Sequence, residues 1–363
     1  MLTRQELLQN PDLYRDKARG ALIGLAIGDS FGDASRKPEN QMAYGFTTDF
    51  NKGASWSTDD TEFAMLTAQI LIESGGRPTS DCVVDAWLKH VATQDELKRG
   101  GASEFEASRN LRKGLRPPLS GRYNAYGHSD GAAMRISPVG VLCAGDVNRA
   151  IAMAEIDASI SHDREGIWGA QSVAAAVAAA MADANIDEIL AAAMKPIPRD
   201  TWYAYAMQRA LDIVDEADGN LLLAWMPLHD ELWTSYKAAV SEAVAEAFGV
   251  LKLMHGDFRT GVTCAGNFGR DADTIGAICG AILGAKTPLP HRHLPSVYQG
   301  HGYPRGCRPA DGRGHFAGMR RKTKFRRHTF HDELPPHSGS APVRQDCAAV
   351  YAGHAKRRAY RGH

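Results

Sequence analysis

Apolar side chains recur at helical spacing along most of this chain. In residues 61–73, for example, Phe63, Leu66 and Ile70 fall on one face of a helix, which a Gly-Gly pair then ends. Helices are also expected at residues 15–28, 81–93, 103–114, 148–161, 166–184, 186–194, 202–217 and 232–254. Helix formers dominate these segments, and alternating β-branched runs are nearly absent. The pattern therefore predicts an all-α fold.

The composition is that of a soluble globular protein. Of the 363 residues, 44% are hydrophobic and 23% are charged, near the averages for such proteins. The N-terminal segment 1–14 lacks the apolar stretch of a signal peptide, and the most apolar segments, 167–181 and 274–285, are shorter than the ~20 residues needed to span a bilayer. Six scattered cysteines without a CxxC pair favour buried free thiols over a disulfide framework. We therefore expect a cytoplasmic protein with no membrane partner.

The charge balance changes sign near the C-terminus. Residues 291–363 carry 15 Lys and Arg against 4 Asp and Glu, so the formal net charge of zero divides into +11 there and −11 before it. From about residue 288 the chain is rich in Arg, His, Gly and Pro, a composition that cannot bury enough apolar surface to form a core. We expect a helical domain at 1–287 and a poorly ordered tail at 288–363. Nucleic-acid binding by this tail is the weaker alternative, because aromatic residues are sparse and no known module is discernible.

Two acidic clusters stand at expected helix starts. The first is STDDTE, at residues 57–62, and the second is GRDADT, at residues 269–274. Carboxylates and hydroxyls at such positions ordinarily cap the helix and interact favourably with its dipole. Capping does not explain the redundancy, however, because each start carries two carboxylates and a threonine where one cap would suffice.

Metal binding is the alternative to capping. Clustered carboxylates repel one another unless a cation neutralises them, and a ligand set made only of oxygen atoms suits Mg²⁺ or Mn²⁺ rather than zinc. Two such helix starts, if they converge, would hold a pair of ions about 3.5–4 Å apart. Gly276, Gly280 and Gly284 would permit a close helix approach beside that site. On spacing alone, capping and metal binding both stay open.

Five segments together resemble the ADP-ribosylglycohydrolase family, in the same order along the chain. They are GALIGLAIGDSFG (20–32), STDDTE (57–62), SDGAAMRISPVG (129–140), SISH (159–162) and GRDADTIGAICGAILGA (269–285). The resemblance covers about residues 15–287. It implies an orthogonal all-α bundle with a centre of two Mg²⁺ or Mn²⁺ ions, acting on ADP-ribosyl bonds.

The resemblance also implies roles for particular residues. The metal ligands would be Thr58, Asp59, Asp60, Asp271, Asp273 and Thr274. The catalytic carboxylates that orient or deprotonate water would be Asp60 and Asp273. Substrate binding would fall to Ser129, Asp130, Gly131, Ala132, Met134, Arg135 and His162. The loop at 129–135 would hold the diphosphate and ribose through its backbone N–H groups. For His162, contact with the ligand phosphates and a capping or core position are both open.

Two positions depart from the family pattern. Many relatives carry an acid–base or substrate-positioning glutamate where this chain has Arg36, which cannot exchange a proton at neutral pH. That role is vacant or moved, with Asp33 and Glu39 as nearby candidates. Asp130 stands where an asparagine is common, and it adds negative charge near the expected diphosphate.

These observations predict a metal-dependent hydrolase that cleaves ADP-ribose from an acceptor. Its substrate would be an ADP-ribosylated protein, with arginine or serine as the modified residue, or a small-molecule conjugate. A nucleoside or small-molecule ribosyl hydrolase is the first alternative, which Arg36 and Asp130 favour. A non-catalytic ADP-ribose-binding or crystallin-like protein is the second, which retention of all six candidate ligands opposes.

Overall fold

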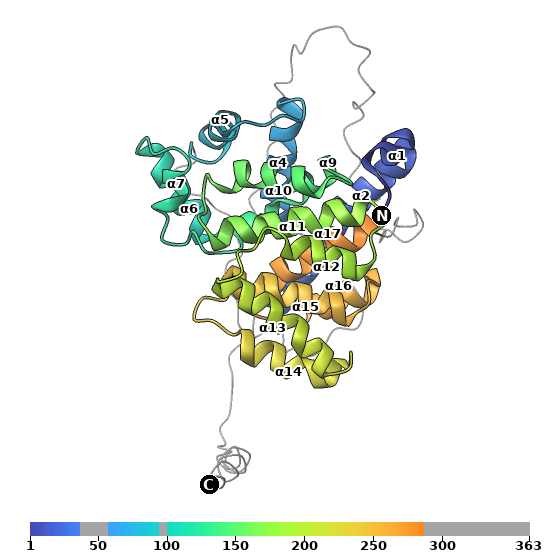
Figure 1. The fold of residues 1–363 in the computed structure, drawn as a ribbon. Helices are drawn as coiled ribbons and strands as arrows, with labels where there is room; N and C mark the ends of the chain where they lie inside the picture. Colours follow the sequence, from blue (N-terminus) through green and yellow to red (C-terminus); the bar gives the residue numbers. More distant parts are fainter. Residues whose placement is uncertain (37–56, 94–99, 287–363) are drawn as a thin grey trace, which may run out of the picture. The chain divides into compact units, whose positions relative to one another are not determined.

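The computed structural model describes residues 1–36, 57–93 and 100–286, and these segments form helices joined by loops (Figure 1). The described helices are α1 (Arg4–Gln9), α2 (Pro11–Ser35), α4 (Asp59–Glu73), α5 (Ser80–His90), α6 (Ala102–Arg112), α7 (Leu119–Arg122), α8 (Gly131–Arg135), α9 (Ser137–Leu142), α10 (Val147–Ala158), α11 (Glu165–Met181), α12 (Ile186–Met194), α13 (Trp202–Glu216), α14 (Leu221–Leu232), the π-helix η1 (Val240–Val244), α15 (Ala245–Leu253), α16 (Phe258–Gly266) and α17 (Ala272–Lys286). The described part holds no β-strand beyond one isolated bridge, so the all-α prediction is confirmed.

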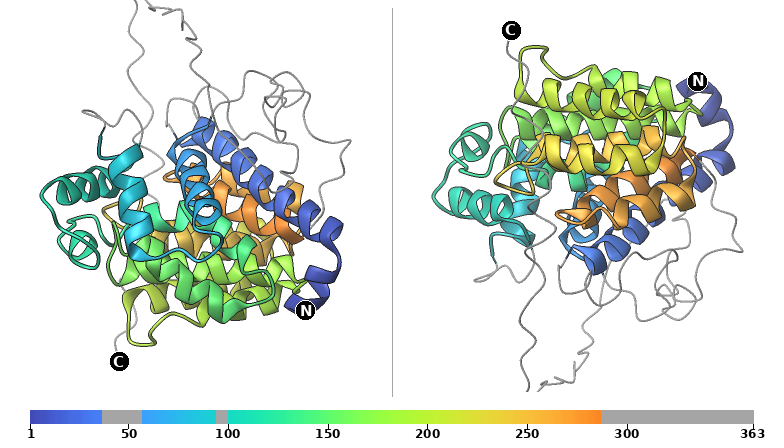
Figure 2. Two further views of the ribbon diagram at one scale, coloured as in Figure 1. Left: turned by 90° about the horizontal axis from the view of Figure 1, so that it is seen from above. Right: turned by 90° about the horizontal axis from the view of Figure 1, so that it is seen from below.

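The two most closely packed helices, α2 and α17, come from opposite ends of the described chain. They run antiparallel, and in both views of Figure 2 the first (blue) lies beside the last (orange). A Cβ atom added at Gly24 or Gly28 would overlap the carbonyl oxygen of Gly280 or Gly276, respectively. Only glycine permits this backbone-to-backbone contact. The close helix approach expected from the glycines of α17 is therefore confirmed, and it brings the C-terminal end of α2 beside the N-terminal end of α17.

The main hydrophobic core surrounds α11. This helix is alanine-rich, and its residues from Gly169 to Met181 are all buried, as expected of a helix that is apolar on every side. A smaller core lies between α4, α5 and α6, where Phe63 packs against Trp87 with ring centroids 5.5 Å apart. The N-terminal end of α4, which carries the first acidic cluster, is thus held between two packed regions.

The helix predicted at residues 232–254 is confirmed over residues 240–253, but its first part, residues 233–239, is wrong. The chain instead leaves α14 at Leu232, forms a loop, and re-enters through η1 and α15. The loop is stable because the buried carboxylate of Glu242 accepts hydrogen bonds from the backbone N–H (2.7 Å) and the hydroxyl (2.9 Å) of Thr234. Ala239 then forms an antiparallel bridge with Ser129. The loop residues 233–239 include Trp, Thr, Ser and Tyr, which are weaker helix formers than the alanines and glutamates that follow them.

The cysteines fit the expectation of free thiols. Cys143, Cys264 and Cys279 are free and buried, whereas Cys82 is free and exposed. Cys307 and Cys347 lie outside the described residues, as does the predicted tail at 288–363. No helix in the described segments has both the length and the apolar character needed to span a membrane.

Candidate functional site

The first acidic cluster is organised by a residue of α2. Asp29, which is fully buried, accepts hydrogen bonds from the backbone N–H of Thr58 (3.0 Å) and of Thr61 (3.2 Å), and from both threonine hydroxyls. The Thr58 side chain also serves as the N-cap of α4. Asp29 and the Thr58 side chain therefore accept hydrogen bonds from three of the N–H groups at this helix start, those of Thr58, Asp60 and Thr61.

Asp29 and Thr58 provide most of the cap, so capping alone does not account for both Asp59 and Asp60. The Asp60 side chain is 1% exposed, and its Oδ1 atom has no hydrogen-bond partner among the described residues. Burial, together with the charges of Asp273 and other carboxylates, raises the pKa of Asp60 well above its ordinary value. Burial and the neighbouring Glu104 raise the pKa of Asp59 to about 6.

The second cluster enters α17 through a turn with two residues in the left-handed region, Gly269 (φ 81°) and Arg270 (φ 56°). The Arg270 side chain holds the turn, because it donates to Glu242 Oε2 at 2.8 Å and lies over the Trp233 ring. Beyond it, Asp271, Asp273 and Thr274 are all buried. Burial and the nearby Asp271 charge raise the pKa of Asp273 to about 8.

The glycine-rich loop meets both clusters. The backbone N–H of Asp130 donates to the carbonyl of Ala238 at 2.9 Å, and the buried Asp130 carboxyl interacts electrostatically with those of Asp271 and Asp60. Burial and the Asp271 charge raise the pKa of Asp130 well above its ordinary value. The structure thus brings Asp130 together with four of the predicted metal ligands, Asp59, Asp60, Asp271 and Asp273.

Several side chains of this loop serve the interior of the protein. Arg135 is fully buried, with its guanidinium 2.8 Å from Asp157 and 3.3 Å from Glu104, and Met134 belongs to the smaller core. Ala132 is also buried, and a Cβ atom added at Gly131 would overlap Glu104 Oε1. These residues could therefore contact a ligand only through their backbone groups, as predicted for the loop. That contact stays a prediction.

His162 has the contacts of a core histidine. It is 1% exposed, with Nδ1 2.7 Å from the Ser161 hydroxyl and Nε2 3.0 Å from the Ser129 hydroxyl. Burial and the nearby Arg135 charge lower its pKa well below the ordinary value, which keeps the ring neutral. These contacts match the core alternative and position Ser129 at the start of the loop, while contact with ligand phosphates stays a prediction.

Two basic side chains reach the second cluster. Arg36 Nη1 contacts Asp273 Oδ2, and Arg36 Nε lies 2.9 Å from Asp33 Oδ1. Lys237 Nζ lies 2.6 Å from Asp271 Oδ1. The position where relatives carry a glutamate therefore supplies a cation to the centre. Of the two candidates to replace that glutamate, Asp33 is held by Arg36, and Glu39 lies outside the described residues.

The carboxylates fit a hard divalent cation in their chemistry. Asp60 Oδ1, Asp130 Oδ2 and Asp273 Oδ1 are buried without a hydrogen-bond partner in the described segments. Burying an uncompensated carboxylate costs several kcal/mol, and a bound cation would offset that cost. Even so, no three His, Cys, Asp or Glu side chains of the described residues already stand as a ready-made metal site. Asp271 and Asp273 are instead paired with Lys237 and Arg36.

The part of the chain that is similar to known proteins includes both acidic clusters and the glycine-rich loop. The sequence profile described as ADP-ribosylglycohydrolase matches residues 10–298. The chain belongs to the ADP-ribosylglycohydrolase family. Family membership supports a hydrolase that acts on ADP-ribose conjugates.

Individual relatives are distant. An uncharacterized protein of Archaeoglobus fulgidus is 29% identical over 294 residues, covering 78% of this chain and 92% of the relative. The uncharacterized protein YegU of Escherichia coli K12 is 29% identical over 301 residues, covering 74% and 87%. The ADP-ribosylarginine hydrolase Tri1 of Pseudomonas putida is 24% identical over 291 residues, covering 76% and 71%. A solved structure titled ADP-ribosylglycohydrolase-related protein complex shares the fold, with a TM-score of 0.56 at 22% identity over 79% of this chain and 95% of that one.

Three residues of this ADP-ribosylglycohydrolase site were missed from the sequence. Asp29 holds α4, Glu242 holds the turn into α17, and Glu104 is a buried carboxylate beside Asp59 and the glycine-rich loop. For Asp29 a signal existed, because it lies inside the GDSFG part of a family segment. Glu104 and Glu242 sit in ordinary helical sequence, where nothing distinguishes a buried carboxylate from an exposed one.

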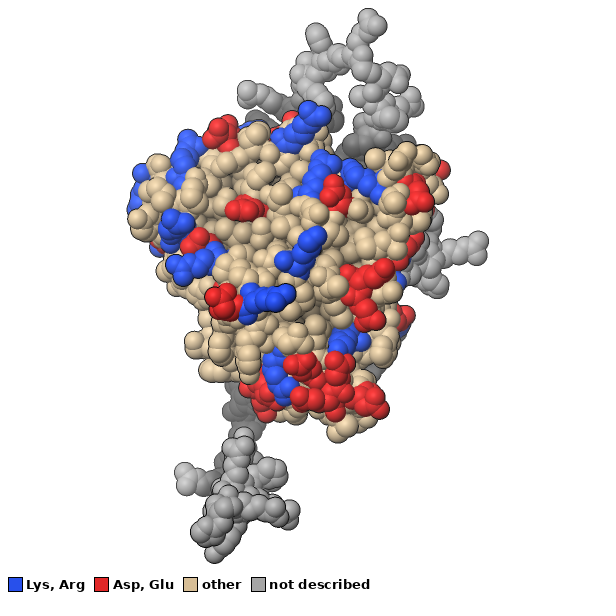
Figure 3. Space-filling model, viewed as in Figure 1, with Lys and Arg blue, Asp and Glu red and all other residues tan. Residues whose placement is uncertain are grey.

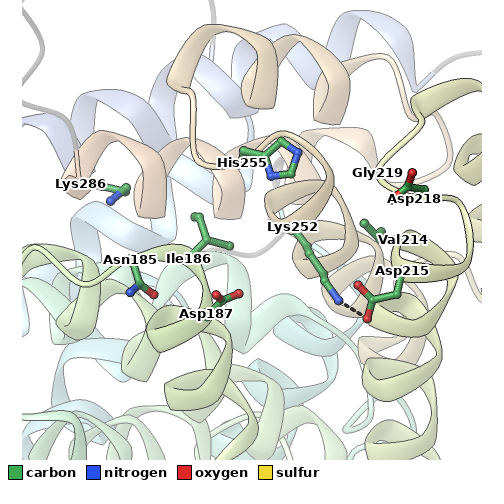
Figure 4. A pocket seen from close by; sticks show the side chains of 10 residues that line it. All are labelled: Asn185, Ile186, Asp187, Val214, Asp215, Asp218, Gly219, Lys252, His255 and Lys286. Atoms are coloured by element: carbon green, nitrogen blue, oxygen red, sulfur yellow. Dashed lines mark ion pairs between the residues drawn. The ribbon is translucent and has the colours of Figure 1, made fainter.

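A pocket of about 480 Å³ lies far from these clusters (Figure 4). It opens at the opposite end of α17, beside Lys286, about 20 Å along the helix from Asp273. Both of its lysines already have partners, since Lys252 pairs with Asp215 at 2.5 Å and Lys286 donates to a backbone carbonyl. Acidic side chains also gather on the nearby surface around α13 and α14, where Arg209 bridges Glu216 and Glu231 (Figure 3). Three buried carboxylate oxygens without a hydrogen-bond partner in the described segments lie instead in the acidic clusters and the glycine-rich loop.

The raised pKa values predict how the metal-free protein responds to pH. The Asp59 pKa of about 6 and the Asp273 pKa of about 8 exceed the value of about 4 in an unfolded chain. Between these values the folded state binds more protons than the unfolded state, so the free energy of unfolding falls as the pH rises from about 4 to about 8. We expect Tm in EDTA to decrease from pH 5 to pH 8, and Mn²⁺ to weaken the decrease.

Variants isolate the contribution of Asp273 to this decrease. In Asp273→Asn the decrease of Tm with pH should be smaller than in the unmodified protein, because one buried charge is gone. In Asp187→Asn, which changes an exposed carboxylate, the decrease should match that of the unmodified protein. Equal pH profiles for all three proteins in EDTA would contradict the assignment.

Proposed function

We propose that this protein is a divalent-cation-dependent hydrolase that releases ADP-ribose from a modified amino-acid side chain, with arginine as the first candidate. One observation carries the proposal: two helix starts and a glycine-rich loop bring together five carboxylates, three of which keep a buried oxygen without a hydrogen-bond partner. Family membership and similarity to an ADP-ribosylarginine hydrolase support it. A cytoplasmic location stays a prediction.

Each part of the centre has a proposed task. Thr58, Asp59, Asp60, Asp271, Asp273 and Thr274 would hold Mg²⁺ or Mn²⁺. When bound, such a cation supplies Lewis-acid polarisation of the ribose and helps to position a water molecule. The backbone of the loop at 129–135 would bind the diphosphate and ribose, and His162 would orient that loop through Ser129.

One of the carboxylates would accept the proton of the attacking water. Asp60 or Asp273 accepts that proton as the water oxygen bonds to the anomeric carbon and the glycosidic bond breaks. The bonding electrons leave with the acceptor side chain, which takes up a proton, through a transition state of oxocarbenium character. Burial raises the pKa of both groups above the ordinary value of an aspartate, which makes each carboxylate a stronger base for the water proton.

A substrate panel tests the proposal. The full chain is incubated with peptides carrying ADP-ribosylated arginine or serine and with free nucleosides, each with Mg²⁺, Mn²⁺ or EDTA, and released ADP-ribose or base is measured by chromatography. We expect ADP-ribose release from the arginine conjugate with a divalent cation and at least about a 100-fold loss in EDTA.

The alternatives predict different outcomes of the same panel. Cleavage of nucleosides but of neither peptide would replace the proposal with a nucleoside or small-molecule ribosyl hydrolase, the function that Arg36 and Asp130 favour. Calorimetric binding of ADP-ribose without turnover of any substrate would replace it with a non-catalytic binding protein. Undiminished turnover in EDTA would overturn the metal dependence alone.

A further inference from the structure

Arg36 lies at the meeting point of the two acidic clusters. It is the C-cap residue of α2, which the glycine contact with α17 brings beside the second cluster. Its guanidinium contacts Asp273 through Nη1 and Asp33 through Nε, and its electrostatic interactions extend to Asp271 and Asp60. A guanidinium stays protonated at any physiological pH, and its planar fork binds two carboxylates at once. Arg36 is thus a permanent cation among the candidate metal ligands.

The two clusters differ in whether basic side chains form ion pairs with their carboxylates. In the second cluster, Arg36 occupies one oxygen of Asp273, and Lys237 lies 2.6 Å from Asp271. In the first cluster, no lysine or arginine of the described segments forms an ion pair with Asp59 or Asp60. Among the candidate metal-ligand carboxylates of the described segments, those without a basic partner are therefore the two on α4.

We propose that the centre binds one divalent cation, on the Asp59 and Asp60 side, and that the Arg36 guanidinium stands in place of a second. This inference rests on the proposed function and corrects the two-ion centre expected from the sequence. A second ion beside Asp273 would have to displace Arg36, which would break its contacts with both Asp273 and Asp33. The positive charge and directed hydrogen bond of Arg36 already compensate one oxygen of Asp273, Oδ2.

Metal stoichiometry tests the proposal without any activity measurement. The full chain, freed of metal with EDTA and dialysed, is titrated with Mn²⁺ in a calorimeter, and the bound ions are counted by native mass spectrometry. We expect one Mn²⁺ per chain for the unmodified protein. Arg36→Ala and Arg36→Gln should each bind two, because both free the oxygens of Asp273 and Asp33.

The matched control is Arg19→Ala. Arg19 lies on the same helix with an exposed side chain near Asp16, so its removal should leave the count at one. Thermal melting and circular dichroism establish that each variant is folded, and the count for the unmodified protein tests the proposal even where a variant fails to fold.

The outcomes separate this proposal from the proposed function. Two ions in the unmodified protein would show that Arg36 swings aside, which overturns the single-ion proposal and leaves metal dependence standing. One ion in both folded Arg36 variants would overturn the role of Arg36. No bound Mn²⁺ in the unmodified protein would overturn both this proposal and the metal dependence on which it rests.

Discussion

Replacing Asp59 and Asp60 together by asparagine is expected to abolish Mn²⁺ binding and lower kcat/KM for an ADP-ribosylated peptide by about 100-fold or more. The same variant should remain folded, because the Asp29 and Thr58 side chains accept most of the hydrogen bonds from the backbone N–H groups at the start of α4. In EDTA its Tm should equal or exceed that of the unmodified protein, since the change removes buried charges that repel one another. Melting in EDTA, Mn²⁺ titration and initial rates measure the three effects.

The matched control for this variant is Glu73→Gln. Glu73 is exposed at the other end of α4, so this change should alter neither Mn²⁺ binding nor turnover. Full activity in the double variant would rule out the centre proposed here. A large fall in its Tm in EDTA would instead show that the two carboxylates serve the fold, as the capping interpretation holds.

The parts of this protein that could be predicted from sequence are those that depend on local patterning. Helical periodicity is a property of neighbouring residues, and it gave the helical class and most of the long helices. The glycines of α17 indicated a close helix contact because no side chain larger than hydrogen fits there. The two acidic clusters were visible because each contains more carboxylates than a helix cap uses.

The features that could not be predicted from the sequence depend on contacts between residues far apart in the chain. Arg36 meets Asp273 across 237 positions, and no local pattern records that pairing. The loop between α14 and η1 depends on the buried Glu242, whose carboxylate accepts a hydrogen bond from Thr234 eight residues before it. Arg135 was assigned to substrate from the family pattern, whereas its side chain lies in the interior with Asp157 and Glu104. Burial decides what a polar residue does, and sequence alone does not show burial.

The contact between α2 and α17 should be the least tolerant of change in the whole described structure. In Gly28→Ala the added methyl group would overlap the backbone carbonyl of Gly276, and a backbone atom cannot turn away as a side chain can. We expect the free energy of unfolding, measured in urea with EDTA present, to fall by at least about 3 kcal/mol. Any variant that still folds should lose turnover and Mn²⁺ affinity, because α2 carries Asp29 and Arg36 while α17 carries Asp273.

The matched control is the same substitution in another buried helix. A Cβ atom at Gly249 of α15 would meet the end of the Leu228 side chain at 3.0 Å and backbone only at 3.7 Å. Gly249→Ala should therefore change stability by no more than about 1 kcal/mol, since the gain in helix propensity offsets a small side-chain adjustment. If Gly28→Ala were as stable and active as Gly249→Ala, the helices could separate without harm. The position of Arg36 between the clusters would then have to be fixed by something other than this glycine contact.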